Sequence, residues 1–268
     1  MTPTIRLIGL PTDCNSSFLR GTAEAPSFIR AQLFSEMGNM ATEAGFEMGE
    51  HFVIDDAGDL PLTEAAGDDI LIEAAVKAAI DANCRPLCLG GDHSVTYPII
   101  KAVAAAHGPI NILHFDAHPD LYDELDGNRR SHASPFARIM EAGLASRLVQ
   151  VGIRTLNRHQ REQAARFGVE IVEMRHFSAD AVPLLGGPLY ISMDLDGIDP
   201  AFAPGVSHHE PGGLSVRDVL NVLARQDAPV VGADVVELNP SRDVNGVTAV
   251  VAAKLTKELM GLMAQPTR

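Results

Sequence analysis

The stretch NILHFDAHPDLYD, residues 111–123, contains the pattern that decides the fold. It begins as a buried β-strand with Ile112, Leu113 and Phe115, and it then carries an ionisable side chain at every second position. These residues are His114, Asp116, His118 and Asp120. Side chains two positions apart on a strand point to the same face, and several charges aimed at one place are costly to bury alone. The stretch therefore predicts a buried strand that leads into a site for a positively charged partner.

Short apolar, β-branched segments alternate with helical patterns along the chain. The candidate strands are residues 4–10, 51–58, 85–90, 110–116, 147–153, 169–174, 188–196 and 229–237. Helix candidates between them include residues 66–82, 94–108, 134–143 and 215–227. This alternation predicts a parallel sheet flanked by helices. Periodicity leaves open whether the eight units close into a barrel or form an open, doubly wound sheet; in both, ligands collect at the carboxyl ends of the strands.

Composition indicates a compact, acidic protein. The 268 residues include 46% hydrophobic and 21% charged residues, which is typical of soluble globular proteins, and no linker or repeat divides them. We therefore expect one domain over residues 1–268. A net charge of −14 argues against a nucleic-acid or anionic-membrane surface, and three cysteines do not suggest a disulfide framework. The absence of a basic leader and of an apolar run of about 18 residues predicts a cytoplasmic protein.

Four stretches with polar residues follow predicted strands. They are LGGDHSVTYP (89–98), DAHPD (116–120), SMDLDGIDPAFAPG (192–205) and VVELNP (235–240). Taken singly, most have ordinary structural explanations, since Asp92 fits a helix N-cap and Glu237 fits an exposed carboxylate. Taken together, they place two imidazoles and four carboxylates at one edge of the sheet. The six residues are His93, Asp116, His118, Asp120, Asp194 and Asp196.

This donor set predicts a pair of divalent metal ions. Nitrogen and oxygen donors suit ions such as Mn²⁺, whereas structural zinc sites are rich in thiolates. One six-coordinate ion would not need so many anionic ligands, but two ions that share carboxylates would, and such pairs stabilise hydrolytic transition states. With Glu237 added, the pocket stays negative even around two ions and a hydroxide. We therefore expect a cationic substrate, and a planar guanidinium fits better than a phosphate ester.

The motifs GGDHS, DAHPD and SMDLDGIDPAFAPG resemble, in this order, the three signatures of the ureohydrolase family of arginases and agmatinases. Further segments resemble the plant-type arginases: residues 15–21, 131–143, 148–158, 205–223 and 231–243. The amino-terminal extension of the plant proteins has no counterpart here, which predicts a bacterial cytosolic relative. The resemblance implies an open three-layer α/β/α fold with a mainly parallel eight-stranded sheet. It also implies two Mn²⁺ per chain, hydrolysis of a guanidinium to urea and an amine, and a homo-oligomer, either a trimer or a hexamer.

The resemblance also implies a role for each site residue. One manganese would be held by His93, Asp116, Asp120 and Asp194. The other would be held by Asp116, His118, Asp194 and Asp196, with Asp116 and Asp194 bridging. The catalytic residues would be Asp120, which aims the attacking water, His132, which transfers a proton, and Glu237, which holds the guanidinium. His114 matches no ligand position and is expected to pack or support the ligands, and Asp199 is expected to shape a turn.

Substrate choice depends on weaker signals. Asn128 and Ser131 are candidate donors to the α-carboxylate of arginine. Asn157 occupies the position where animal arginases bind the α-amino group with an aspartate, and the plant-type proteins also have asparagine there. We therefore expect L-arginine rather than agmatine, with a guanidino acid as a further alternative. A deacetylase-like zinc hydrolase is a distant alternative, because such an enzyme needs only one zinc and not the full set of six ligands. Whether His208 and His209 line the pocket or only shape a loop stays open.

Overall fold

A computed structural model describes residues 2–65 and 67–265, and in these residues eight strands form one sheet. The strands are β1 (Thr4–Leu10), β2 (Val53–Asp59), β3 (Cys84–Gly90), β4 (Ile110–Phe115), β5 (Ala145–Ile153), β6 (Glu170–Glu173), β7 (Leu189–Asp194) and β8 (Val230–Val236). Their order is β2-β1-β3-β8-β7-β4-β5-β6, and every pairing is parallel. The eight predicted strands are confirmed, with differences only at their ends. Because β2 and β6 lie at the two edges, the sheet is open and not a barrel.

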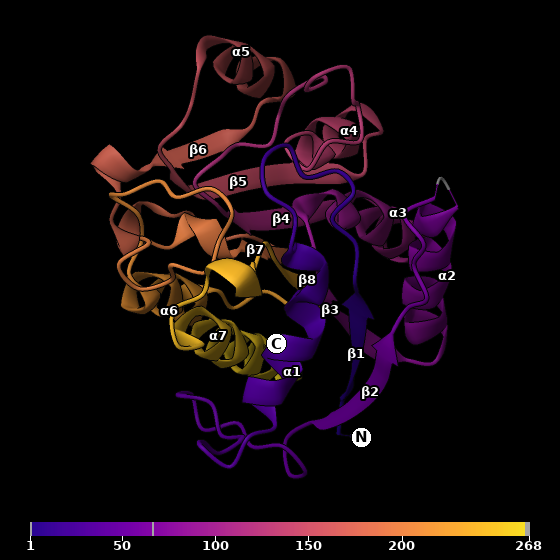
Figure 1. Ribbon diagram of the computed structural model, residues 1–268. Coiled ribbons are helices and arrows are strands. Elements are labelled where there is room, and N and C mark those ends of the chain that lie inside the picture. The colour runs from indigo at the N-terminus through magenta and orange to yellow at the C-terminus, as the bar shows by residue number, and fades with distance from the viewer. Residues whose placement is uncertain (1, 66, 266–268) are drawn as a thin grey trace.

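Seven α-helices cover both faces of the sheet in the described part of the chain. They are α1 (Ala25–Leu33), α2 (Asp68–Asp81), α3 (Thr96–His107), α4 (Pro135–Glu141), α5 (Arg158–Phe167), α6 (Val216–Arg225) and α7 (Val247–Ala264). Helices α1, α6 and α7 pack on one face, and α2, α3, α4 and α5 pack on the other (Figure 1). Residue 66, where one predicted helix starts, lies outside the described residues. The three-layer α/β/α fold is therefore confirmed.

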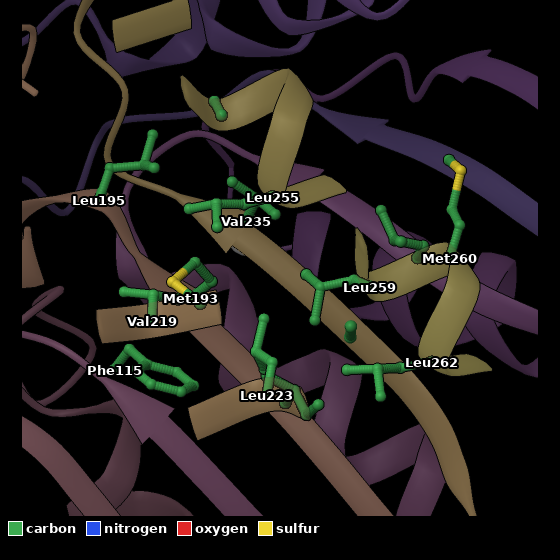
Figure 2. Close-up of a cluster of buried hydrophobic side chains, with 14 of the residues drawn as sticks. Phe115, Met193, Leu195, Val219, Leu223, Val235, Leu255, Leu259, Met260 and Leu262 are labelled. Carbon is green, nitrogen blue, oxygen red and sulfur yellow. The ribbon is translucent and has the colours of Figure 1, made fainter. Parts of the chain in front are cut away.

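Each face of the sheet has its own hydrophobic core. In β4, Leu113 and Phe115 point into the core under α6 and α7, whereas Ile112 points into the core under α2 and α3. This division explains why the strands read as continuous apolar runs, since parallel strands buried on both faces need apolar side chains on both. Figure 2 shows part of the first core, where strand residues face residues of α6 and α7. The labelled side chains include Phe115 of β4, Met193 of β7, Val235 of β8, Val219 and Leu223 of α6, and Leu255 and Leu259 of α7.

The strand order brings distant parts of the sequence together at the centre of the sheet. Strands β3, β8, β7 and β4 are neighbours although up to 146 positions separate their sequences, because β7 and β8 return to lie between β3 and β4. All four run in the same direction, so their carboxyl ends lie at one edge. This edge carries the predicted site residues. Among the helices that the structure describes, none has both the length and the apolar character needed to cross a membrane.

Candidate active site

His93 forms the centre of a buried group of ligands just after β3. Its Nδ1 lies 2.9 Å from Asp194 Oδ2, 3.2 Å from Asp120 Oδ2 and 3.3 Å from Asp116 Oδ2. The side chain is fully buried, and Nδ1 has no hydrogen-bond partner. Buried polar atoms without a partner are rare in proteins, and an imidazole nitrogen that faces three carboxylates is the donor arrangement of a metal site. These residues therefore fit a divalent cation.

A second group of ligands adjoins the first through Asp116. His118 Nδ1 lies 3.3 Å from Asp116 Oδ1 and 3.1 Å from Asp196 Oδ2, while the other oxygen of Asp116 faces His93. Within each group, the candidate ligand atoms lie within 4.8 Å of one another. The structure thus brings all six predicted ligands together in two groups that share Asp116. Asp194 belongs to the first group in this geometry, and its predicted bridging role stays a prediction.

Close approach of two turns makes this arrangement possible. Asp196 follows β7, and its Oδ1 accepts a hydrogen bond of 3.1 Å from the backbone N–H of Ala117. A Cβ on Gly197 would lie 2.7 Å from the backbone nitrogen of Asp116, closer than side chains pack. Glycine at this position therefore lets the turn after β7 contact the turn after β4.

The carboxylates of the cluster are strongly perturbed. Burial raises the pKa of Asp194 well above its ordinary value and raises that of Asp120 to about 7. Burial also raises the pKa of Asp196. For Asp116 burial acts in the same direction, but the neighbouring histidines, His114 foremost, outweigh it and hold the pKa well below its usual range. A buried cluster of this kind disfavours several negative charges at once, and a bound cation would reverse that balance.

A hydrogen-bonded chain behind His93 orients its ring. His93 Nε2 lies 3.0 Å from Ser192 Oγ, and Ser192 donates to Asp234 Oδ1 at 2.7 Å, so Ser192 accepts from the ring. Asp234 also accepts from Tyr190 OH at 2.8 Å and from Thr96 Oγ1 at 2.9 Å. With Nε2–H donating to Ser192, Nδ1 is the ring nitrogen left to bind a cation among the carboxylates. Asp234 was not predicted from the sequence, although an aspartate inside an otherwise apolar strand was a signal for it.

His114 supports the cluster from below. Its ring stacks on Phe136 with centroids 4.0 Å apart, and its Nε2 lies 2.8 Å from Asp116 Oδ2. Gln150 donates to His114 Nδ1 at 3.0 Å and to the carbonyl of Pro119 at 2.6 Å. Burial lowers the pKa of His114 to about 4, so the ring is neutral and donates from Nε2. His114 therefore orients Asp116, in agreement with the expected supporting role.

His132 and Glu237 form a buried pair next to the ligand cluster. His132 Nδ1 lies 2.8 Å from Glu237 Oε1, and the same oxygen accepts from the backbone N–H of His93 at 2.9 Å. Burial lowers the pKa of His132, but the charge of Glu237 outweighs it and raises the pKa to about 9. On its other side, His132 Nε2 lies 2.8 Å from Ser17 Oγ. Ser17 was not predicted, because a serine in a polar loop gives no signal.

Two of the predicted catalytic residues have a strained backbone. Asp120 has φ 51° and Glu237 has φ 67°, which lie in the left-handed region that side chains other than glycine rarely adopt. Both residues follow strands at the carboxyl edge, where the chain turns sharply. Strain of this kind is concentrated at functional sites, where the surrounding structure holds it in place.

A cavity of about 270 Å³ opens above the cluster. Its lining includes His118, Asp120, Asp194, Asp196, His132 and His208, and among the described residues no lysine or arginine lines it. Glu237 is 3% exposed and contacts the cavity wall through His132. The negative lining favours a positively charged ligand.

Besides Glu237, the other three predicted substrate residues also lie outside the cavity lining. Asn128 donates to Asn15 Oδ1 at 3.0 Å, and Ser131 is buried. Asn157 caps α5 and donates to the hydroxyl of Tyr122 at 2.6 Å, and Tyr122 does line the cavity. Their predicted contacts with substrate thus stay predictions.

The two histidines of the 205–223 segment have different places. His208 lines the cavity, while His209 is exposed and bonds the carbonyl of Pro204. Asp199 accepts from the backbone N–H groups of Ala201, Gly212 and Gly213, as expected of a turn residue. His208 is therefore the member of this segment that a ligand in the cavity would contact.

Comparison with known proteins decides the family. The arginase family profile matches residues 3–261. The chain belongs to the arginase family. It is 54% identical to "Arginase 1, mitochondrial" of Arabidopsis thaliana, over 94% of this chain and 79% of that protein. It is also 35% identical to the human "Guanidino acid hydrolase, mitochondrial", over 97% of this chain and 78% of that protein.

The same assignment follows from solved structures. The "Arginase from Medicago truncatula" superposes with a TM-score of 0.93 at 46% identity, covering 98% of this chain and 88% of that one. The predicted family and fold are therefore confirmed. The chain is an enzyme of the ureohydrolase family, and arginase is favoured over agmatinase. This membership sets aside the deacetylase-like zinc hydrolase.

The predicted cytoplasmic location is wrong. It is contradicted by the plant arginases at 54% and 50% identity, which are named mitochondrial and chloroplastic/mitochondrial. The prediction rested on composition and on the residues before the first strand. A folded catalytic domain has the same composition in any compartment, so these features do not report where it works.

Proposed function

We propose that this arginase-family enzyme hydrolyses L-arginine to L-ornithine and urea with two Mn²⁺ ions. The observation that carries the proposal is the unpartnered Nδ1 of His93 among three carboxylates, beside a second group around His118. Identity of about half the residues with plant proteins named arginase supports arginine as the substrate. We also propose that residues 1–268 form a single ureohydrolase domain and that the protein is a homo-oligomer, a trimer or a hexamer.

The six clustered side chains would hold the metal pair. His93, Asp116, Asp120 and Asp194 would bind one ion, and Asp116, His118, Asp194 and Asp196 would bind the other. When bound, such a pair would lower the pKa of a shared water, so that hydroxide is available as the nucleophile near neutral pH. Asp234 and His114 keep the ligating atoms of His93 and Asp116 aimed at this position.

The remaining residues bind and orient the substrate. Glu237 carries the charge that pairs with the guanidinium, and its rigid, buried position fixes the distance to the reacting carbon. Asp120 faces the cavity and accepts a hydrogen bond from the attacking water. The departing amine needs a proton, which Asp120 or His132 supplies.

Agmatine is the second candidate substrate, because one observation favours it. The described cavity lining has no arginine or lysine, and Asn128 and Ser131 lie outside it, so the α-carboxylate of arginine has no cationic partner there. Agmatine has no such carboxylate. A guanidino acid would meet the same negative lining with its own carboxylate, although one relative is named a guanidino acid hydrolase.

Urea release and metal content test the proposal together. The purified protein would be loaded with manganese, and urea would be measured with arginine, agmatine, guanidinobutyrate and guanidinopropionate. We expect two manganese ions per chain and the highest kcat/KM with arginine. Preference for agmatine would establish the second candidate, and one bound ion or no urea from any of the four would reject the proposal.

A further inference from the structure

The segment of residues 15–21, NSSFLRG, crosses the edge of the active-site cavity and is fixed at both ends. At its start, Asn15 donates from its backbone N–H to Asp92 Oδ2 at 2.9 Å, and its carbonyl accepts from the backbone N–H of His132 at 3.1 Å. At its end, the carbonyl of Leu19 accepts from Ser207 Oγ at 3.1 Å. The middle of the segment is thereby held against the cavity, which Ser17 lines.

Ser17 makes two contacts with the same nitrogen of His132. Its hydroxyl oxygen lies 2.8 Å from His132 Nε2, and its backbone N–H donates to that nitrogen at 3.2 Å. A nitrogen that accepts from a backbone N–H carries no proton of its own, so these contacts describe the neutral ring, which His132 adopts above its pKa of about 9. The ring proton therefore sits on Nδ1, where it donates to Glu237 Oε1 at 2.8 Å.

The neighbouring serine shows that position in the segment matters. Ser16 and Ser17 are adjacent, but the hydroxyl of Ser16 is buried without a hydrogen-bond partner and does not line the cavity. Ser17 is exposed at the cavity, whereas His132 is 8% exposed. The hydroxyl of Ser17 thus lies between the ring nitrogen of His132 and the space where a substrate would bind.

We propose that Ser17 is a further catalytic residue, which holds the neutral tautomer of His132 and relays a proton from Nε2 to the cavity through the serine hydroxyl. This inference rests on the proposed hydrolysis of a guanidinium. When His132 is protonated, Nε2–H donates to Ser17 Oγ and the hydroxyl proton of Ser17 passes to the leaving amine. The ring returns to its neutral Nδ1–H form, and Ser17 has lost one proton and gained another.

Three variants separate this role from general packing. Ser17→Ala removes the hydroxyl but keeps the backbone N–H, Ser17→Thr keeps both, and Ser16→Ala is the matched control on the adjacent residue. Because a water molecule can replace part of a proton relay, we expect Ser17→Ala to lower kcat about tenfold. We expect KM to stay within about twofold, because the relay acts on the departing amine and the residues proposed to hold the guanidinium are unchanged. Ser17→Thr should recover most of the kcat, and Ser16→Ala should match the wild type.

A spectroscopic measurement tests the contact without turnover. Solid-state ¹⁵N spectra of histidine-labelled, full-length protein would be recorded at about pH 10, above the pKa of His132, with diamagnetic Zn²⁺ added, and His132 would be assigned by its loss in His132→Gln. The inference predicts a protonated Nδ1 and a hydrogen-bonded acceptor at Nε2. It also predicts that Ser17→Ala, but not Ser16→Ala, shifts the Nε2 signal toward that of a free acceptor.

The outcomes distinguish the inference from the proposed function. If the wild type releases urea and Ser17→Ala has an unchanged kcat, the inference is overturned and the function stands. If the wild type releases no urea from any guanidine, the function falls, and the ¹⁵N spectra then decide alone whether Ser17 fixes His132. A protonated Nε2 in the wild type at about pH 10, above the pKa of His132, overturns the inference in either case.

Discussion

At its amino edge, where β1, β3 and β8 begin, the sheet borders a cavity of about 520 Å³, whereas the cavity at its carboxyl edge measures about 270 Å³. The charged side chain in the larger cavity is Arg85, and its Nη1 is buried without a hydrogen-bond partner. Helices α2 and α3 end there, at Asp81 and His107. Their last carbonyl groups carry partial negative charge and favour a cation nearby. Arg85 thus has an electrostatic explanation that requires no ligand.

The carboxyl edge differs in how its charges are arranged. Six ionisable side chains from three separate segments contact one another there, and four of them are carboxylates that burial pushes toward protonation or that histidines must balance. A fold gains no stability from such like charges unless something compensates them. Mutual contact of unpartnered charged groups, rather than cavity volume, therefore marks the functional edge of this sheet.

The largest expected effect comes from removing the residue shared by both ligand groups. Asp116→Ala deletes one oxygen from the group around His93 and one from the group around His118. We expect bound manganese to fall below one ion per chain. Because even residues behind the ligands change metal affinity ten- to a hundredfold, we expect kcat/KM for urea release to fall more than about a hundredfold. Normal metal content, measured by plasma emission spectroscopy, would contradict the assignment of Asp116.

Glu237→Gln should separate turnover from metal binding. The side chain keeps its size and can still accept from the backbone N–H of His93, but it loses the charge that pairs with His132 and with a guanidinium. We expect kcat/KM to fall about a hundredfold, a typical cost of losing one well-placed electrostatic partner. Manganese content should equal that of the wild type. An active variant would remove Glu237 from the substrate site.

Sequence reasoning reached the ligand cluster because its pattern is local. The alternation of ionisable residues in 114–120 and the pair Asp194 and Asp196 each lie within one strand end, and parallel strands bring such ends to one edge. The order of the strands was not derivable from the pattern, since nothing in β7 or β8 states that they insert between β3 and β4. The resemblance to a family supplied the open three-layer fold, and the strand order came from the structure alone.

Residues that act through other residues could not be predicted from the sequence. Asp234 reads as one polar residue in a strand, and Ser17 reads as one serine among several, until the fold places them beside His93 and His132. Helix α7 was not singled out either, because apolar residues surround it on nearly all sides and give no amphipathic period. Loop residues such as Asn157 were predicted by position alone, and the structure uses it as a helix cap.

The stability of the metal-free protein should depend on pH at the carboxyl edge. Burial raises the pKa of Asp120 from 3.8 to about 7, so the folded state holds this proton more tightly than the unfolded state does. Protonated Asp120 therefore stabilises the folded state at acidic pH. This stabilisation is lost as the pH rises from about 4 to about 7, so the free energy of unfolding falls over that range. Because asparagine does not titrate, Asp120→Asn should reduce this pH-dependent loss in the free energy of unfolding by a few kcal/mol, the size expected from the pKa shift. Urea denaturation of both metal-free proteins at pH 5 and pH 8 measures the free energy of unfolding. If it changes by the same amount between the two pH values in both proteins, Asp120 does not titrate in this way.

The smallest effect is expected at the amino edge, and it tests the comparison itself. Arg85→Met keeps an unbranched apolar stem against the same cavity and removes the charge. Because Arg85 lies at the end of the sheet opposite the ligand cluster, manganese content and kcat/KM should stay within about twofold of the wild type. The free energy of unfolding should change by less than about 1 kcal/mol, since the variant exchanges a half-buried charge near helix carbonyls for a better-buried methyl group. A large loss of turnover in Arg85→Met, with the fold intact by circular dichroism, would mean that the two edges are coupled and that a lone buried charge also marks function in this sheet.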